Sequence, residues 1–135
     1  MVLLPSSTII RCVKFEKATE HEIADWFVSV LELTQGELVA ALEKVHSMPK
    51  QSAQSGFKFG WSYGFLRGLL VANRVSFREP SPQRWMKDLN CRTGGDKNVT
   101  KQKAHERWPK FSSQITHAIA DSLLLAEWVR LYGDK

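Results

Sequence analysis

One continuous apolar run constrains the fold of this 135-residue chain more than any other feature. Residues 38–42 read Leu-Val-Ala-Ala-Leu, so a strand built from them is apolar on both faces. Such strands are typical of α/β proteins in which helices cover both sides of a sheet. Glu43 follows directly. Ligands of open α/β sheets sit at the carboxyl ends of strands, so Glu43 is a candidate for chemistry, and a solvated strand-end Glu is the alternative.

The segments that precede this run predict an α/β order. Short β-type runs occupy residues 2–4 and 8–15, and a turn signal separates them. A capping box over residues 19–22 and apolar residues at helical spacing predict an amphipathic helix over 20–33. A buried strand over 37–45 follows it. Strand, helix, strand is the α/β signature, and we expect one domain over residues 1–135.

The remainder of the chain predicts four more helices and one more strand. In chain order these are a helix from residue 53, a strand over 75–78, and helices over 82–89, 98–108 and 113–132. The helix over 98–108 places Thr100, Ala104 and Trp108 on one face.

Glycine recurs every four residues in the helix that begins at residue 53. Gly56, Gly60, Gly64 and Gly68 therefore share one stripe, and each costs about 1 kcal/mol relative to alanine. A helix of this composition favours close approach by another backbone. Tight packing within the chain and a homodimer interface both account for the stripe.

Positive charge is concentrated in the middle of the chain. Residues 1–43 hold three Lys or Arg and seven Asp or Glu, residues 44–110 hold fourteen and four, and residues 111–135 hold two and three. A basic block interleaved with aromatic residues suits contact with a nucleic-acid backbone, and an ordinary solvated surface is the alternative. The aromatic residues are Phe57, Phe59, Trp61, Tyr63, Trp85 and Trp108. The basic residues expected to bind DNA are Lys44, Lys50, Lys58, Arg84, Lys87, Lys97 and Lys101.

The last predicted helix carries an acid in apolar surroundings. Asp121 falls on a stripe with Leu124, Leu125 and Trp128, and His117 lies one turn earlier. A carboxylate in such surroundings is costly unless it is paired or binds a cation. If this helix crosses the carboxyl edge of the sheet, Asp121 and His117 face Glu43. The sequence then predicts a site for Mg²⁺ or Mn²⁺, and a capping or ion-pair role for Asp121 is the alternative.

The two cysteines and the apolar runs bear on the compartment. Cys12 and Cys91 have no Cys or His at metal-ligand spacing, so we expect reduced thiols. No apolar run approaches the roughly 20 residues of a membrane span, and no secretory signal is evident. We therefore expect a soluble cytoplasmic protein.

Four segments together resemble the RuvC-like Holliday junction resolvases, especially the phage-type branch. They are residues 42–49, residues 57–60 with Tyr63 and Gly64, residues 82–85, and residues 120–127, and the resemblance covers about residues 37–130. It implies a ribonuclease-H-like mixed sheet flanked by helices, a homodimer, and metal-dependent hydrolysis of DNA phosphodiesters at branched junctions in a bacterial or phage-infected cell. By position it assigns catalytic and metal-binding roles to Glu43 and Asp121, with His117 as their companion.

The chain also departs from the pattern of this family. The family's first strand, which bears an Asp, belongs ahead of these segments, and residues 1–15 contain no Asp. Many relatives carry an acid or a His three residues before the final Asp, where this chain has Ala118. The resemblance therefore implies an N-terminally shortened domain with impaired cleavage. The alternatives are a protein whose early strands are rearranged, a catalytically inactive homologue that binds DNA junctions, and a protein-interaction module built on the glycine stripe.

Overall fold

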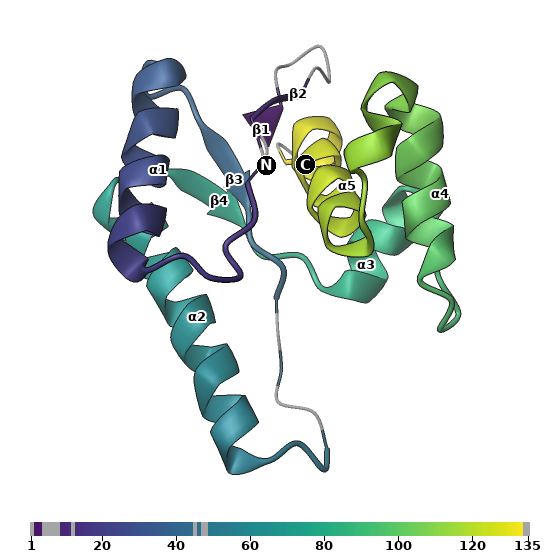
Figure 1. Ribbon diagram of the computed structural model, residues 1–135, viewed down its shortest axis with the longest axis horizontal. Coiled ribbons are helices and arrows are strands. Elements are labelled where there is room, and N and C mark those ends of the chain that lie inside the picture. The colour runs from purple at the N-terminus through teal and green to yellow at the C-terminus, as the bar shows by residue number, and fades with distance from the viewer. Residues whose placement is uncertain (1, 4–8, 12, 45, 47–48, 134–135) are drawn as a thin grey trace.

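The computed structural model describes residues 2–3, 9–11, 13–44, 46 and 49–133. In this part of the chain, helices make up most of a mixed α/β structure (Figure 1). In chain order the elements are β1 (Val2–Leu3), β2 (Ile9–Arg11), α1 (Glu20–Leu33), β3 (Val39–Ala41), α2 (Ala53–Ala72), β4 (Ser76–Arg78), α3 (Pro82–Asp88), α4 (Asn98–Arg107), the 3₁₀ helix η1 (Pro109–Gln114) and α5 (His117–Tyr132).

The strands form two separate pairs. β3 and β4 are parallel, with Val39 opposite Ser76 and Ala41 opposite Arg78, and α2 makes the crossover between them. β1 and β2 pair as an antiparallel hairpin. The element order and the parallel pair agree with the predicted mixed α/β class, but β2 and β3, the strands that flank α1, belong to different sheets.

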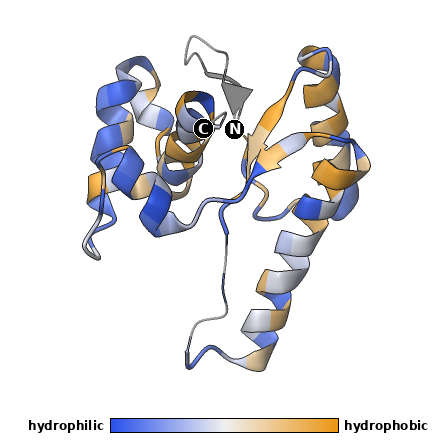
Figure 2. Cartoon of the chain, turned by 180° about the vertical axis from the view of Figure 1, so that it is seen from behind, coloured by the Kyte–Doolittle hydropathy of each residue, from blue (hydrophilic) through white to orange (hydrophobic). Residues whose placement is uncertain are grey.

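The core lies where α5 packs between β3 and α4 (Figure 1). Leu123 and Trp128 of α5 are buried together with Trp85 of α3. The face of α4 predicted from the sequence is confirmed, since Thr100 and Ala104 are buried and Trp108 follows them into the core. Figure 2 shows hydrophobic residues along β3 and α1, whereas α4 is largely hydrophilic on its outside.

The predicted limits of α1 are confirmed at both ends. The Thr19 hydroxyl accepts a hydrogen bond from the Glu22 amide at 3.2 Å, and the Glu22 carboxylate accepts one from the Thr19 amide at 2.7 Å. The carboxylate also accepts a hydrogen bond from the Thr19 hydroxyl at 2.9 Å, and the bonds that it accepts from the Thr19 amide and hydroxyl lower the pKa of Glu22. At the other end Gly36 has a φ of +81°, which glycine adopts without strain. Only Val30 of this helix is buried, so its apolar face is incompletely covered.

Two predicted elements differ from those observed. β3 covers three residues and is not buried on both faces, because a groove lies beside it and leaves Val39 48% exposed. The last helix starts at His117 and not at 113, because the Thr116 side chain caps the amide of Ile119 and residues 109–114 form η1.

The N-terminal half of α2 extends away from the rest of the described chain (Figure 1). Its Phe57, Phe59 and Trp61 side chains are 68%, 50% and 59% exposed. A Cβ atom added at any glycine of the stripe would meet no atom within 4 Å apart from the backbone of α2 itself. The prediction that this glycine stripe packs tightly within the chain is therefore wrong for the described residues.

Glu127 is a sensitive point of the core. It is 3% exposed, and its carboxylate oxygens lie 2.6 Å from Arg107 Nη2 and 2.6 Å from Arg130 Nε. We expect Glu127→Gln to lower the free energy of unfolding by about 2 kcal/mol, because a buried counter-charge for two guanidinium groups is lost. Urea denaturation measures this. The exposed Glu106→Gln should change stability by less than about 0.5 kcal/mol, and equal losses for the two variants would contradict the expectation.

Candidate functional site

Glu43 follows β3 and is held by a tryptophan from α3. The Trp85 indole Nε1 donates a hydrogen bond to Glu43 Oε1 at 2.8 Å, across 42 residues of sequence. Trp85 is 1% exposed, so the indole is fixed by the core around it. Ser81 caps α3 by accepting from the Arg84 amide, and Pro82 takes the first helical position, as the sequence predicts. The Glu43 carboxylate is thereby fixed in direction while one oxygen stays available.

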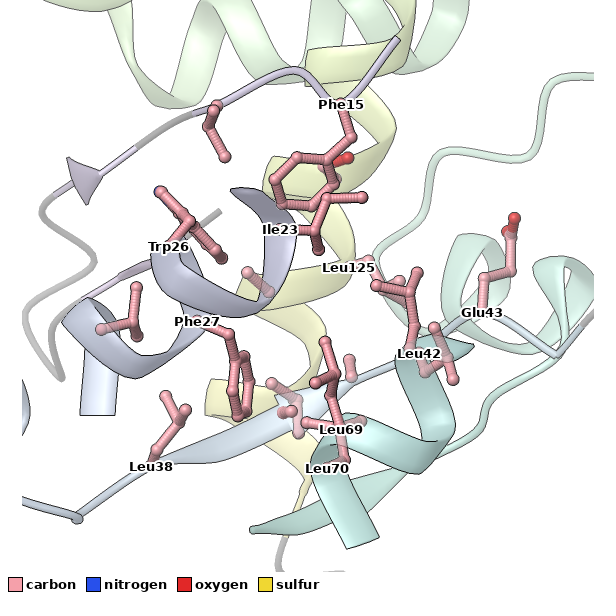
Figure 3. A pocket seen from close by; sticks show the side chains of 18 of the residues that line it. Phe15, Ile23, Trp26, Phe27, Leu38, Leu42, Glu43, Leu69, Leu70 and Leu125 are labelled. Carbon is pink, nitrogen blue, oxygen red and sulfur yellow. The ribbon is translucent and has the colours of Figure 1, made fainter. Parts of the chain in front are cut away.

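A groove with a volume of about 1180 Å³ runs beside β3. We call it the β3 groove, and it is lined by residues 13–16, by the apolar side of α1, by residues 37–43, by Leu66, Leu69 and Leu70 of α2, and by one side of α5. Figure 3 shows Glu43 at one end, with its carboxylate pointing away from the labelled apolar side chains. A carboxylate therefore lies at one end of a groove whose walls are formed largely by apolar side chains of α1, α2 and α5.

Asp121 sits on α5 at the border of the core. Its Oδ1 atom is buried and has no hydrogen-bond partner among the described residues. Burial raises the pKa of the Cys91 thiol, the Lys103 charge opposes the rise, and the Asp121 charge adds to it. Asp121 therefore lies close to Cys91, which belongs to the same buried cluster as Trp85. A buried carboxylate oxygen without a partner costs about 1–3 kcal/mol or more, so this position favours a ligand.

His117 is the first residue of α5 and is exposed. Its Nε2 atom lies 3.3 Å from Asn98 Oδ1 of α4. Like Glu43, it lines the β3 groove, whereas Asp121 lies one turn further along α5, toward Cys91. The packing of α5 on β3 thus brings the elements that carry the three predicted site residues together.

Within the described residues, no group of three or more His, Cys, Asp and Glu side chains is arranged to hold a metal ion. Two carboxylates and a histidine therefore do not form a ready-made cage. Mg²⁺ is commonly bound through one or two carboxylates with several waters, so the donors that Glu43 and Asp121 offer still suit it. The metal site remains a prediction.

Six of the seven basic residues expected to bind DNA are exposed, and Lys101 is half-buried. Arg84 is the most constrained of them, because its guanidinium lies 6.0 Å from the Trp128 ring centroid and 3.7 Å from an Asp88 carboxylate oxygen. The aromatic residues of the basic block divide into two groups. Trp85 and Trp108 are buried in the core and are not free to contact a nucleic acid, whereas Phe57, Phe59 and Trp61 are exposed.

Neither the known protein-family models nor the curated protein sequences include a match. None of the helices in the described residues combines the length and apolarity that crossing a membrane requires. Cys91 is a free, buried thiol, as predicted, and Cys12 lies outside the described residues.

Sequence reasoning did not find the role of Trp85. The sequence suggested Trp85 as a nucleic-acid contact because it lies in a basic block. Its burial follows from its position on the inner face of a short capped helix, and its bond to Glu43 depends on the tertiary packing of α3 near the end of β3.

The bond between Trp85 and Glu43 can be measured by a double-mutant cycle. We expect Trp85→Phe to destabilise the protein and to show a coupling energy of about 1 kcal/mol with Glu43→Gln, because each change weakens the same hydrogen bond. Urea denaturation of the two single variants and of the double variant provides the coupling. Strictly additive effects would mean that the two side chains do not interact.

Proposed function

We propose that this chain is a nuclease domain of the Holliday junction resolvase type, which binds branched DNA and hydrolyses its phosphodiester bonds with Mg²⁺ or Mn²⁺. Glu43 and Asp121 hold the ion, and His117 assists them. The sequence resemblance suggests this function. The parallel pair of β3 and β4, with α5 packed against β3, supports the part of the proposal that concerns an α/β sheet flanked by helices.

One observation carries the proposal, namely the buried Oδ1 atom of Asp121 that has no partner in the described residues. A carboxylate is rarely buried without a partner, because both its charge and its hydrogen-bonding capacity must be compensated. A divalent cation compensates both. α5 carries Asp121 and packs against β3, which Glu43 follows, so a second carboxylate lies at the end of an adjacent element.

The chemistry divides between the ion and the side chains. A bound Mg²⁺ or Mn²⁺ supplies an activated water and stabilises the charge that develops on the leaving oxygen. The Trp85 indole holds Oε1 of Glu43, so Oε2 is the atom left to bind the ion. His117 is exposed at the start of α5, one turn before Asp121 on the same helix. Two carboxylate ligands suit a site for one metal ion better than a site for two metal ions. We therefore expect slow cleavage.

Cleavage of a labelled four-way DNA junction tests the proposal. We expect nicking that requires Mg²⁺ or Mn²⁺ and that falls at least a hundredfold in Glu43→Gln and in Asp121→Asn, because each change removes a carboxylate ligand. Glu106→Gln, an exposed acid on α4, is the matched control and should cleave normally. Nicking that persists without the metal, or unchanged nicking in Glu43→Gln, would refute the assigned roles.

A second candidate is a catalytically inactive protein that binds DNA junctions. The exposure of the basic residues favours it, as does the lack of a three-ligand metal group in the described residues. The exposed Phe59, next to Lys58 and outside the proposed dimer face, offers a stacking surface for a base at a branch point. Junction binding without nicking, in the experiment above, would select this candidate.

Both candidates predict binding that depends on salt. The logarithm of the affinity should fall linearly with the logarithm of the salt concentration, and Lys58→Ala or Lys97→Ala should each lower the slope by about 0.9 if its charge neutralises one phosphate. Fluorescence anisotropy with a labelled junction measures this. Lys17→Ala, an exposed change outside the basic block, should leave the slope unchanged. Affinity that ignores ionic strength would exclude both candidates.

We also propose that the chain is a homodimer through α2. Phe57, Trp61, Gly64, Gly68 and Val71 follow helical spacing along one side of this helix, and the three larger side chains are more than half exposed. The glycines leave room for a second helix, because nothing in the described chain fills the space beside them. A two-fold axis beside α2 would bury the same face of both copies.

Sedimentation of two α2 variants tests the dimer. Gly64→Leu should raise the dissociation constant at least tenfold, because a leucine at Gly64 holds the partner helix away. Ser62→Leu adds the same side chain about 200° around the helix and should leave the mass of the assembly unchanged. An unaltered mass for Gly64→Leu, or equal disruption by both variants, would contradict an interface on the glycine stripe.

A further inference from the structure

One edge of β3 is left unpaired by the described part of the chain. The Leu42 amide donates to the Arg78 carbonyl at 3.0 Å, and the Lys44 amide donates to the Pro80 carbonyl at 2.9 Å. Successive amides of a strand point to opposite edges, so those of Val39, Ala41 and Glu43 point away from β4. None of the described strands pairs with that edge. Unpaired backbone groups along a strand are a template for another strand.

The β3 groove lies along this open edge, and helices wall it on both sides. Ile23, Trp26 and Phe27 of α1 line one wall, and Leu125 and Val129 of α5 line the other. Figure 3 shows that the labelled side chains of α1 point into the groove and lie opposite Leu125. The three α1 side chains are only partly buried, although they form the apolar face of a well-capped helix. A layer of side chains between α1 and α5 would complete their burial.

We propose that the β3 groove binds an extended strand of a separate polypeptide, which pairs with the open edge of β3. Successive side chains of a strand point to opposite faces, so this strand presents apolar residues alternately to α1 and to α5. Its expected length is about six residues, or about 20 Å, to match residues 38–43. Binding of this kind derives affinity from main-chain hydrogen bonds and selectivity from the side-chain walls.

Other occupants fit the groove less well. Its volume of about 1180 Å³ exceeds the range of about 300–1,000 Å³ that is usual for small-molecule sites. A second copy of the chain has no suitable strand to offer among its described residues. β1, β2 and β4 are only two or three residues long, and residues 38–42 already lie among their own helices.

Peptide binding followed by amide hydrogen exchange tests the proposal. The probes are three capped peptides, each with six alternating Val and Ile, Val and Leu, or Val and Phe residues between terminal lysines. The protein variant is Ala41→Pro, which removes one amide from the open edge and none from the pairing with β4. Ala41→Ser keeps the amide and is its matched control. Val39→Pro repeats the test at an exposed position if Ala41→Pro does not fold.

We expect at least one peptide to slow exchange at the amides of Val39, Ala41 and Glu43 at least tenfold. Its affinity should fall at least tenfold for Ala41→Pro but not for Ala41→Ser. A version of the peptide with alternate N-methylated amides keeps its side chains and should bind at least tenfold more weakly. Equal binding of that version would overturn strand pairing, and so would a failure of all three peptides to protect these amides. Protection that rises with protein concentration, without peptide, would assign the edge to a second copy and overturn the proposal.

This inference does not depend on the proposed nuclease function. The exchange experiment contains neither DNA nor a metal ion, so its outcome and that of the cleavage assay are independent.

Discussion

The structure depends on the burial of α5 between β3 and α4. Leu123, Leu124 and Trp128 fill the core from this helix, and Glu127 links it to α4 through Arg107. The same packing carries Asp121 to the border of the core, where one of its oxygens lacks a partner in the described chain. A helix that is apolar around much of its girth has no other stable position than between two layers. The candidate site is therefore a consequence of the core.

Local signals in the sequence predicted most helices, and interactions between distant residues explain the failures. The limits of α1 and the start of α3 follow from caps within four residues of each end, so a sequence pattern is sufficient to find them. The burial of β3 depends on what covers the strand, which its own residues do not specify. The bond between Trp85 and Glu43 spans 42 residues, so no local pattern reveals it. Glu43 was predicted as a site residue because strand ends are themselves recognisable.

Two surfaces of the described chain leave apolar side chains or backbone hydrogen-bonding groups uncovered, and the two surfaces suit different partners. The exposed side of α2 combines glycines with large apolar side chains, which suits another helix. The β3 groove combines open backbone groups with apolar walls, which suits a strand. Neither surface overlaps the buried oxygen of Asp121. Association through α2 would leave all three proposed site residues free, whereas a strand in the β3 groove would lie beside Glu43 and His117, which line it.

The central claim is that Glu43 and Asp121 bind the same divalent ion, and paramagnetic broadening by Mn²⁺ tests it most directly. In nuclear magnetic resonance spectra of the isotope-labelled protein, we predict that Mn²⁺ selectively broadens the backbone amides of Glu43 and Asp121 and the Trp85 indole signal. Glu43→Gln and Asp121→Asn should each remove the broadening at all three positions. Broadening that is confined to Glu20 and Glu22 in the first turn of α1, or that persists at Asp121 in Glu43→Gln, would show that the two carboxylates do not share an ion.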